Sequence, residues 1–365
     1  MSDFSGREVL VTGATGFIGG RLVEKLVLEK EARVRALVRD FSHASRLARF
    51  PLPMIAGDLL DEKALDQAVA GCEVVFHCAH DFRSSEANLA GTRRLAEACL
   101  RHKVRRLVYT SSISVYEPLP DGELDESVPV SPSGWTYKDD KIAAERLLEG
   151  YHRDLGLPVA TILPTIVYGP FGKAWTIGPV THLRQSRVVL PKDSPGRCNA
   201  LYVDDCVEAL LLAAREPGAV GERILVSGPN TVTWHEFYRR YERMLGTRSL
   251  VFMERAEIER LNRAGAGAPK TGLIRRDPRR VLDWAPARRL YKAVWKRFAG
   301  QALRDRTRKI LPAPLRLPNE QQLALFEAET HVRTDRARKI LGFAPRFPFE
   351  RGMALTEEYV KWAAL

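Results

Sequence analysis

The stretch VLVTGATGFIGG, residues 9–20, decides the fold, because it runs from an apolar strand through a glycine-rich turn into a helix. Gly13, Gly16 and Gly19 have the spacing G-x-x-G-x-x-G, a variant of the dinucleotide fingerprint. The first glycine permits the tight turn, the second lets the backbone approach a pyrophosphate, and the third lets the helix pack closely on the strand. Amides at the start of the helix then face the phosphates. We expect the neighbouring residues Thr15, Phe17 and Ile18 to belong to the same cofactor site.

Short β-rich runs alternate with helical patterns through the first 165 residues. The predicted strands are residues 9–11, 34–38, 54–56, 74–77, 107–110 and 159–163. Alternation of this kind predicts an α/β fold, a Rossmann-type doubly wound parallel sheet with crossover helices on both faces. In such folds the ligand lies at the carboxyl ends of the strands.

Beyond residue 166 the alternation becomes irregular, and prolines interrupt it. A helix at 203–215, a strand at 223–227 and a helix at 234–245 are still predicted. We expect a Rossmann domain at 1–166, with returning elements near 200–230, and a smaller C-terminal substrate lobe at 167–365. The lobe includes a basic insertion at about 247–330.

The composition is that of a soluble globular protein, with 45% hydrophobic and 28% charged residues in a chain of 365. No long uncharged stretch and no apolar N-terminal leader is evident, so we expect a cytoplasmic protein. The five cysteines form no C-x-x-C pair, which suits buried thiols in a reducing compartment and argues against a metal site.

The formal net charge of +12 is concentrated in one segment, since residues 247–316 hold 19 Lys and Arg against 6 Asp and Glu. Within it, 286–310 has an apolar stripe with aromatic residues and a basic remainder, the pattern of a helix on an anionic membrane surface. The alternative is that the stripe packs on the protein's own lobe or on a partner subunit, as in a homodimer. No zinc or helix-turn-helix pattern supports nucleic-acid binding.

Tyr137 and Lys141 are four residues apart on a predicted helix, so they share a face. A phenol has a pKa of about 10, and acid–base work near neutrality requires its phenolate to be stabilised. The ammonium of Lys141, together with an oxidised nicotinamide, would lower that pKa. Ser112, at the end of a strand, would hold the substrate oxygen against the Tyr137 hydroxyl.

The glycine turn, Ser112 and the Y-x-x-x-K pair resemble the extended short-chain dehydrogenase/reductase family, also called the NAD-dependent epimerase/dehydratase family. The resemblance covers about residues 8–246 and resumes at 331–361. Six further motifs occur in order: GDL at 57–59, VFHCAH at 75–80, NLAGT at 88–92, LPTIVYGP at 163–170, YVDD at 202–205 and DRARKILGFAP at 335–345.

The resemblance implies roles for further residues. Asp58 would contact the adenine beside Leu59, and the backbone near Cys78 and Ala79 would line the adenosine and pyrophosphate. Asn88 would help position Lys141 through water or backbone contacts. The run that would pass beside the nicotinamide contains Pro164, Ile166 and Val167. The histidines His77 and His80 are interpreted as packing or cleft-lining residues rather than a metal pair.

The end of the second strand bears on the choice of cofactor. NAD-selective enzymes of this build carry an acid there, whereas this chain reads Val38-Arg39-Asp40. Because an arginine stacks on adenine and holds a 2′-phosphate, Arg39 favours NADP. NAD, with Asp40 on the ribose, is the alternative.

The predicted function is NAD(P)-dependent hydride transfer at a secondary alcohol or ketone of a bulky small-molecule substrate. Ile113 and Ser114 follow Ser112 where 4,6-dehydratases of the family have an Asp-Glu pair, which argues against that reaction. Asn199 stands where many nucleotide-sugar enzymes have an arginine, with Arg197 two residues earlier. A nucleotide-sugar epimerase with tightly bound NAD and a non-catalytic cofactor sensor are the alternatives.

Overall fold

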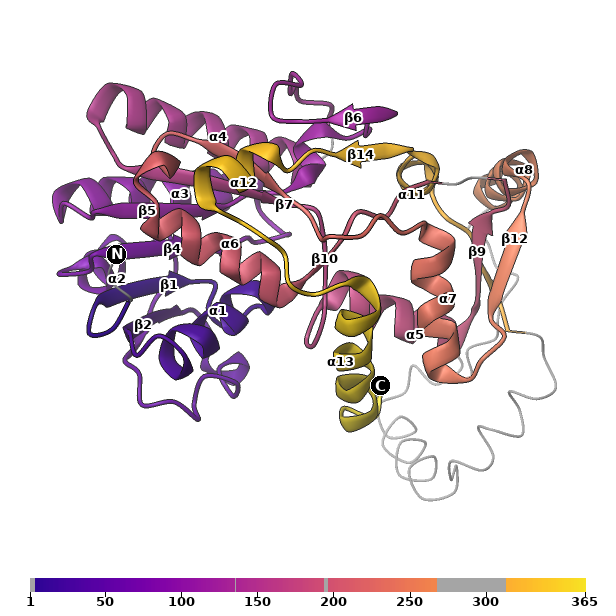
Figure 1. Cartoon of the computed structure of the whole chain (residues 1–365), viewed down its shortest axis with the longest axis horizontal. Coiled ribbons are helices and arrows are strands. Elements are labelled where there is room, and N and C mark those ends of the chain that lie inside the picture. The colour runs from indigo at the N-terminus through magenta and orange to yellow at the C-terminus, as the bar shows by residue number, and fades with distance from the viewer. Residues whose placement is uncertain (1–3, 135, 194–195, 268–312) are drawn as a thin grey trace, which may run out of the picture.

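The computed structural model describes residues 4–134, 136–193, 196–267 and 313–365. The basic segment predicted at 286–310 lies outside these residues. Figure 1 shows a layered α/β half that contains the N-terminus, joined near β10 (Ala200–Tyr202) to a second group of helices and strands. Among the described residues, no helix has the length and apolar character that a membrane span requires.

The central sheet has seven strands in the order β11-β7-β5-β4-β1-β2-β3, and every pair in it is parallel. Its strands are β1 (Glu8–Thr12), β2 (Arg33–Val38), β3 (Met54–Ala56), β4 (Val74–His77), β5 (Arg106–Thr110), β7 (Val159–Pro164) and β11 (Arg223–Val226). The predicted parallel sheet is thus confirmed, and each predicted strand is present within one residue at either end. Strand β1 lies between β2 and β4, so the glycine turn that follows it lies near the centre of the sheet's carboxyl edge.

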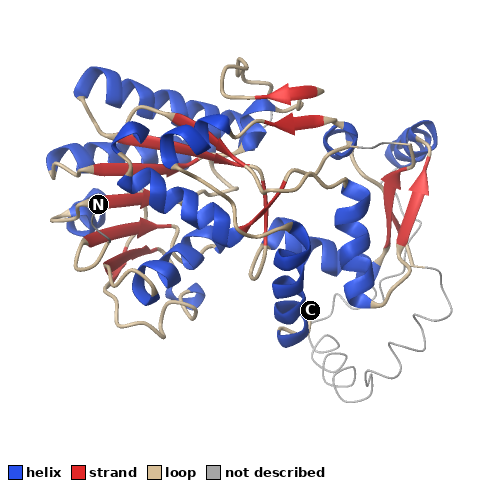
Figure 2. Cartoon of the chain, in the orientation of Figure 1, coloured by secondary structure: helices blue, strands red, loops and turns tan. Residues whose placement is uncertain are grey.

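Helices cover both faces of this sheet (Figure 2). They are α1 (Phe17–Leu28), α2 (Glu62–Val69), α3 (Ser85–Arg101), α4 (Thr136–Leu155) and α6 (Val203–Arg215). Alternate residues of β1 face opposite layers. Val9 and Val11 pack with Leu22 of α1, whereas Leu10 packs with Leu95 of α3. This two-sided burial explains why the strands read as continuous apolar runs.

Most of the remaining elements build the second half of the molecule. Its strands are β6 (Gly122–Leu124), β8 (Ile166–Tyr168), β9 (Arg187–Pro191), β10 (Ala200–Tyr202), β12 (Leu250–Met253), β13 (Leu315–Arg316) and β14 (Thr330–Val332). Its helices are α5 (Gly178–Gln185), α7 (Trp234–Leu245), α8 (Arg255–Gly267), α11 (Glu320–Glu327) and α13 (Phe349–Trp362). Helix α12 (Asp335–Leu341) instead packs against β11 and α6 of the first half. Three small parallel sheets connect them, β10-β8, β12-β9-β13 and β14-β6. The predicted domain division at residue 166 stays a prediction.

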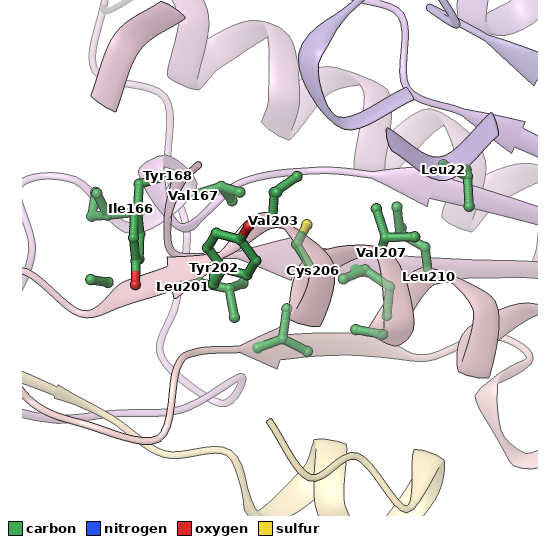
Figure 3. Close-up of a cluster of buried hydrophobic side chains, with 14 of the residues drawn as sticks. Leu22, Ile166, Val167, Tyr168, Leu201, Tyr202, Val203, Cys206, Val207 and Leu210 are labelled. Carbon is green, nitrogen blue, oxygen red and sulfur yellow. The ribbon is translucent and has the colours of Figure 1, made fainter. Parts of the chain in front are cut away.

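A continuous apolar cluster joins the two halves. Figure 3 shows side chains of β8 and β10 beside those of α6, with Leu22 of α1 beyond them. The rings of Tyr168 and Tyr202 pack edge to face within this cluster, with their centroids 5.7 Å apart. Two acids at the start of α6 extend the connection. Asp204 accepts two hydrogen bonds from Arg21, and Asp205 accepts from the backbone amides of Arg346 and Phe347. Through Asp204 and Asp205, the YVDD motif therefore links helix α6 to α1 and to the segment before α13.

Candidate active site

The glycine turn after β1 has a shape that only glycine allows. Gly13 has φ +68°, and a Cβ on it would lie 2.6 Å from the backbone nitrogen of Ala79. A Cβ on Gly19 would lie 2.3 Å from the carbonyl oxygen of Gly13. Gly16 precedes α1 and offers no side-chain cap. The first amides of α1 are therefore left for an anion, as a dinucleotide pyrophosphate requires.

A pocket of about 210 Å³ opens at this edge of the sheet. Its lining contains Thr12, Gly13, Thr15, Gly16, Leu37, Arg39, Gly57, Asp58, Leu59, Cys78, Ala79, His80, Asp81, Ala87 and Asn88. The predicted cofactor residues of the first four strand ends thus meet in one cavity. Phe17, Ile18 and Gly19 form the first turn of α1 behind it. The cavity and the glycine turn fit the adenosine and pyrophosphate of a dinucleotide.

Charged groups surround the part of the pocket near β2. The Arg39 guanidinium lies 2.7 Å from a carboxylate oxygen of Asp81 and 3.4 Å from one of Asp58. Asp40 does not line the pocket; its carboxylate accepts a hydrogen bond from the Ser42 amide and caps a short 3-10 helix. Of the two charged residues that follow β2, Arg39 and Asp40, the one that lines the pocket is therefore Arg39.

Tyr137 and Ser112 meet at the carboxyl end of β5. Ser112 accepts a hydrogen bond from the Ser114 amide, which fixes its side chain beside Tyr137. Burial raises the pKa of Tyr137, and the interaction with the Ser112 side chain opposes this rise. Desolvation of the phenolate dominates over any effect of Lys141 on this pKa, and the lowering predicted for Lys141 together with an oxidised nicotinamide stays a prediction.

Lys141 lies one turn along α4 from Tyr137, as the spacing predicted. It is buried, and its ammonium donates to the carbonyl oxygen of Thr110 at 2.8 Å. The ammonium lies 5.9 Å from the centroid of the Tyr137 ring and 4.9 Å from that of Tyr109. Burial lowers the pKa of Lys141 to about 8. Burial of the Lys141 ammonium next to the phenol and beside the cofactor pocket therefore costs folding free energy.

Two aromatic residues contact Tyr137, and the sequence predicted neither contact, although it indicated that His80 is a packing or cleft-lining residue. The ring of Phe82 stacks on that of Tyr137, with centroids 5.4 Å apart and planes 18° apart, although Phe82 is 78% exposed. His80 meets Tyr137 edge to face at 4.9 Å, and burial lowers its pKa to about 4. Because His80 also lines the pocket, it connects the cofactor site to Tyr137. Their position directly after β4, at the carboxyl edge, was the available signal.

Asn88 lines the pocket, and its role in positioning Lys141 through water or backbone contacts stays a prediction. Its side chain donates to the Asp81 carbonyl oxygen and to the Asp140 carboxylate, and accepts from the Asp81 amide. It therefore fixes the loop after β4, and no direct bond to Lys141 is present. His77 is a buried core histidine between the hydroxyls of Thr12 and Thr92.

The run predicted beside the nicotinamide crosses between the two halves of the molecule. Pro164 ends β7, and Ile166 and Val167 are buried in β8. None of the three lines the pocket near the glycine turn. Asn199, the residue at the position of the expected arginine, is buried and donates its side-chain amide to the Thr330 carbonyl oxygen. It supports β14 and does not present a charge to a substrate.

The lowered pKa of Lys141 predicts a pH-dependent cost to stability. An unfolded lysine titrates near 10.5, so between pH 8 and 10.5 the unfolded chain binds more protons and stability rises with pH. Below pH 8 the buried charge is a constant penalty. We expect Lys141→Met to stabilise the cofactor-free protein at about pH 7 by up to about 3 kcal/mol, since one pKa unit corresponds to about 1.4 kcal/mol. The gain should disappear by about pH 10.

Chemical denaturation at the two pH values measures this difference, with Lys63→Met, on the exposed side of α2, as the control. If the gain in free energy of unfolding of Lys141→Met over the wild type increased with pH, the assignment of a buried charge to Lys141 would be contradicted.

Comparison with known proteins identifies the relatives of this chain. The model of the NAD dependent epimerase/dehydratase family matches residues 9–227. An uncharacterized UDP-glucose epimerase, YtcB of Bacillus subtilis, is 28% identical over 244 residues, which cover 60% of this chain and 77% of YtcB. Dihydroflavonol 4-reductase of Dianthus caryophyllus is 34% identical over 193 residues, 46% of this chain and 53% of the reductase. This chain therefore spans about half the length of that relative.

Among solved structures, UDP-glucuronic acid 4-epimerase from Bacillus cereus, in complex with UDP-glucuronic acid and NAD, has a TM-score of 0.69. It is 18% identical, and the match covers 98% of this chain and 99% of the epimerase, so the likeness concerns the fold. The family match extends over the glycine turn, Ser112, Tyr137 and Lys141. The chain therefore belongs to the NAD-dependent epimerase/dehydratase family, the extended branch of the short-chain dehydrogenases and reductases.

Proposed function

We propose that this protein is an NADP-preferring oxidoreductase that transfers hydride between the nicotinamide and a secondary alcohol or ketone of a bulky substrate. The observation that carries the proposal is the cluster of Ser112, Tyr137 and Lys141, joined through His80 to the pocket at the glycine turn. In reduction, Ser112 would hold the ketone oxygen and Tyr137 would give it a proton. Lys141 would stabilise the phenolate that results.

The cofactor supplies the hydride, and the chain supplies its orientation. Gly13 and Gly16 would lie against the pyrophosphate, and Asp58 and Leu59 would border the adenine. The experiment that tests the function is the replacement of Tyr137 by phenylalanine, assayed as NADPH consumption with a panel of ketones. A dihydroflavonol belongs in the panel because of the reductase relatives.

The surroundings of Tyr137 favour a substrate with an apolar ring. Phe82 presents an exposed aromatic face beside the phenol, and burial of such a face against a ligand is favourable. Where many nucleotide-sugar enzymes have an arginine, this chain has Asn199. Its uncharged side chain donates to the Thr330 carbonyl oxygen, so no cation for a diphosphate stands at this position. These contacts support a reductase of an apolar ketone more than an enzyme of nucleotide sugars.

A nucleotide-sugar epimerase is the second candidate. The match to this chain covers 77% of the relative described as an uncharacterized UDP-glucose epimerase, but only 53% of the dihydroflavonol reductase. An epimerase regenerates its cofactor in every cycle and keeps it bound. NAD that copurifies in stoichiometric amount, with conversion of UDP-glucose and no net NADPH consumption, would decide for the epimerase.

The preference for NADP rests on Arg39, the charged pocket-lining side chain that follows β2. We expect Arg39→Gln to weaken NADPH binding about tenfold and NADH binding less than about twofold, because a charge-assisted bond to the 2′-phosphate is lost. Fluorescence titration of both nucleotides measures this. Arg33→Gln, at the other end of β2 and 72% exposed in its side chain, is the matched control. Equal weakening of both nucleotides by Arg39→Gln would assign the arginine to adenine alone.

The proposal that 286–310 binds an anionic membrane surface rests on the sequence pattern alone, because that segment lies outside the described residues.

A further inference from the structure

An ion pair spans the cofactor pocket between two strand ends that are not neighbours in the sheet. Arg39 directly follows β2, and Asp81 lies four residues beyond the end of β4. Strand β1 and its glycine turn lie between them. The guanidinium and carboxylate are nevertheless 2.7 Å apart, and both line the pocket. The pair therefore crosses the region that the adenosine end of a dinucleotide must occupy.

Asp81 is the fixed member of this pair. Its backbone amide and carbonyl are both hydrogen-bonded by the Asn88 side chain, at 2.7 and 2.8 Å. Its second carboxylate oxygen accepts from the backbone amide and the Nε of Arg83. The carboxylate is 19% exposed, whereas the Arg39 side chain is 53% exposed and has more freedom.

Hydrogen bonds from Arg39 and Arg83 hold the pKa of Asp81 well below its usual range, so the carboxylate is ionised throughout the physiological pH range. A 2′-phosphate that binds Arg39 must then share the guanidinium with this anion or displace it. The hydroxyl of NAD at that position has no charge to be repelled, and it can donate a hydrogen bond to a carboxylate.

We propose that Asp81 is a determinant of cofactor specificity, which engages Arg39 and thereby reduces the advantage of NADP over NAD. The inference rests on the proposed function in one respect, that Arg39 binds the 2′-phosphate. Asp81 acts through Arg39, so it is a positioning residue rather than a catalytic one. Asp58, at 3.4 Å, is the secondary partner of the same guanidinium.

The test is Asp81→Asn, which keeps the size of the side chain and an oxygen that accepts from the Arg83 amide. We expect NADPH to bind about three- to fivefold more tightly, in line with the release of a partly exposed ion pair, and NADH to bind equally well or more weakly. Dissociation constants come from fluorescence titration at fixed ionic strength. Glu73→Gln removes a carboxylate from an arginine pair at the opposite edge of the sheet and serves as the control.

Two comparisons keep this proposal separate from the proposed function. Arg39→Gln alone tests whether the arginine binds the 2′-phosphate, and an unchanged NADPH affinity in that variant would remove the premise. Asp81→Asn in the Arg39→Gln background should leave the ratio of the two affinities unchanged, because the guanidinium is absent. If Asp81→Asn changed the ratio of the NADPH and NADH affinities equally in both backgrounds, Asp81 would repel the 2′-phosphate directly. That result would overturn the proposed role of Asp81 through Arg39.

An Asp81→Asn protein that binds NADPH no more tightly relative to NADH would also overturn the proposal, and so would a ratio that moves toward NADH. Unfolding midpoints of each variant verify the fold, and Asp81→Ser, which retains an oxygen acceptor for the Arg83 amide, provides a second substitution if Asp81→Asn is unstable.

Discussion

Replacement of Tyr137 by phenylalanine is expected to lower turnover at least about a hundredfold and to leave NADPH binding within about twofold of the wild-type value. The phenol is the group that can exchange a proton with a substrate oxygen held by Ser112, and phenylalanine preserves its ring. The ring contacts with Phe82 and His80 do not involve the hydroxyl, so the fold should be retained. Steady-state rates with the best ketone of the panel, together with NADPH titration, measure the two effects.

Tyr151→Phe is the matched control, since Tyr151 lies on the same helix and its hydroxyl donates to Glu97 far from the pocket. It should retain wild-type turnover. Turnover of Tyr137→Phe within tenfold of wild type would refute the assignment of proton transfer to this phenol. A loss of NADPH binding as large as the loss of turnover would instead mean that the hydroxyl serves the cofactor.

Gly13→Ala is expected to weaken NADPH binding more than about tenfold and to lower the unfolding midpoint. An alanine at φ +68° costs about 1 kcal/mol by itself. In addition, its Cβ would lie 2.6 Å from the Ala79 nitrogen and 2.7 Å from the Cys78 carbonyl carbon. These are backbone atoms that cannot rotate away, so the turn or the segment after β4 must move, and both line the pocket proposed for the pyrophosphate.

Gly71→Ala separates backbone strain from this contact. Gly71 has φ +74°, and no atom lies within 4 Å of its hypothetical Cβ. We expect this control to lose about 1 kcal/mol of stability and no NADPH affinity. Wild-type NADPH affinity in Gly13→Ala would show that the turn does not hold the pyrophosphate.

The elements with local signals could be predicted from the sequence. The turn after β1 needs its glycines because Gly13 and Gly19 are crowded by backbone atoms, and that requirement is visible in the spacing. Helix α7 has the predicted limits. It begins after a Thr233–Glu236 capping box and ends at Gly246 in the left-handed conformation, and these signals lie next to each other in the chain.

The missed features depend on contacts between distant segments. The pairing of β6 with β14 joins strands of three residues that lie about two hundred positions apart, and neither has a pattern of its own. Phe82 and Asp81 follow the predicted strand β4, but the sequence does not show that one stacks on Tyr137 and the other reaches Arg39. The raised pKa of Tyr137 likewise depends on burial, which periodicity alone does not measure.

The pairing of β6 with β14 has a consequence for biosynthesis. A ribosome releases Gly122–Leu124 long before Thr330–Val332, so the earlier strand has no partner while most of the polypeptide is being translated. Arg346 and Phe347, whose amides donate to the Asp205 carboxylate in the folded protein, are synthesised later still. Most of the Rossmann sheet can assemble first, but the second half cannot complete its contacts with the first until residues 330–347 have been synthesised.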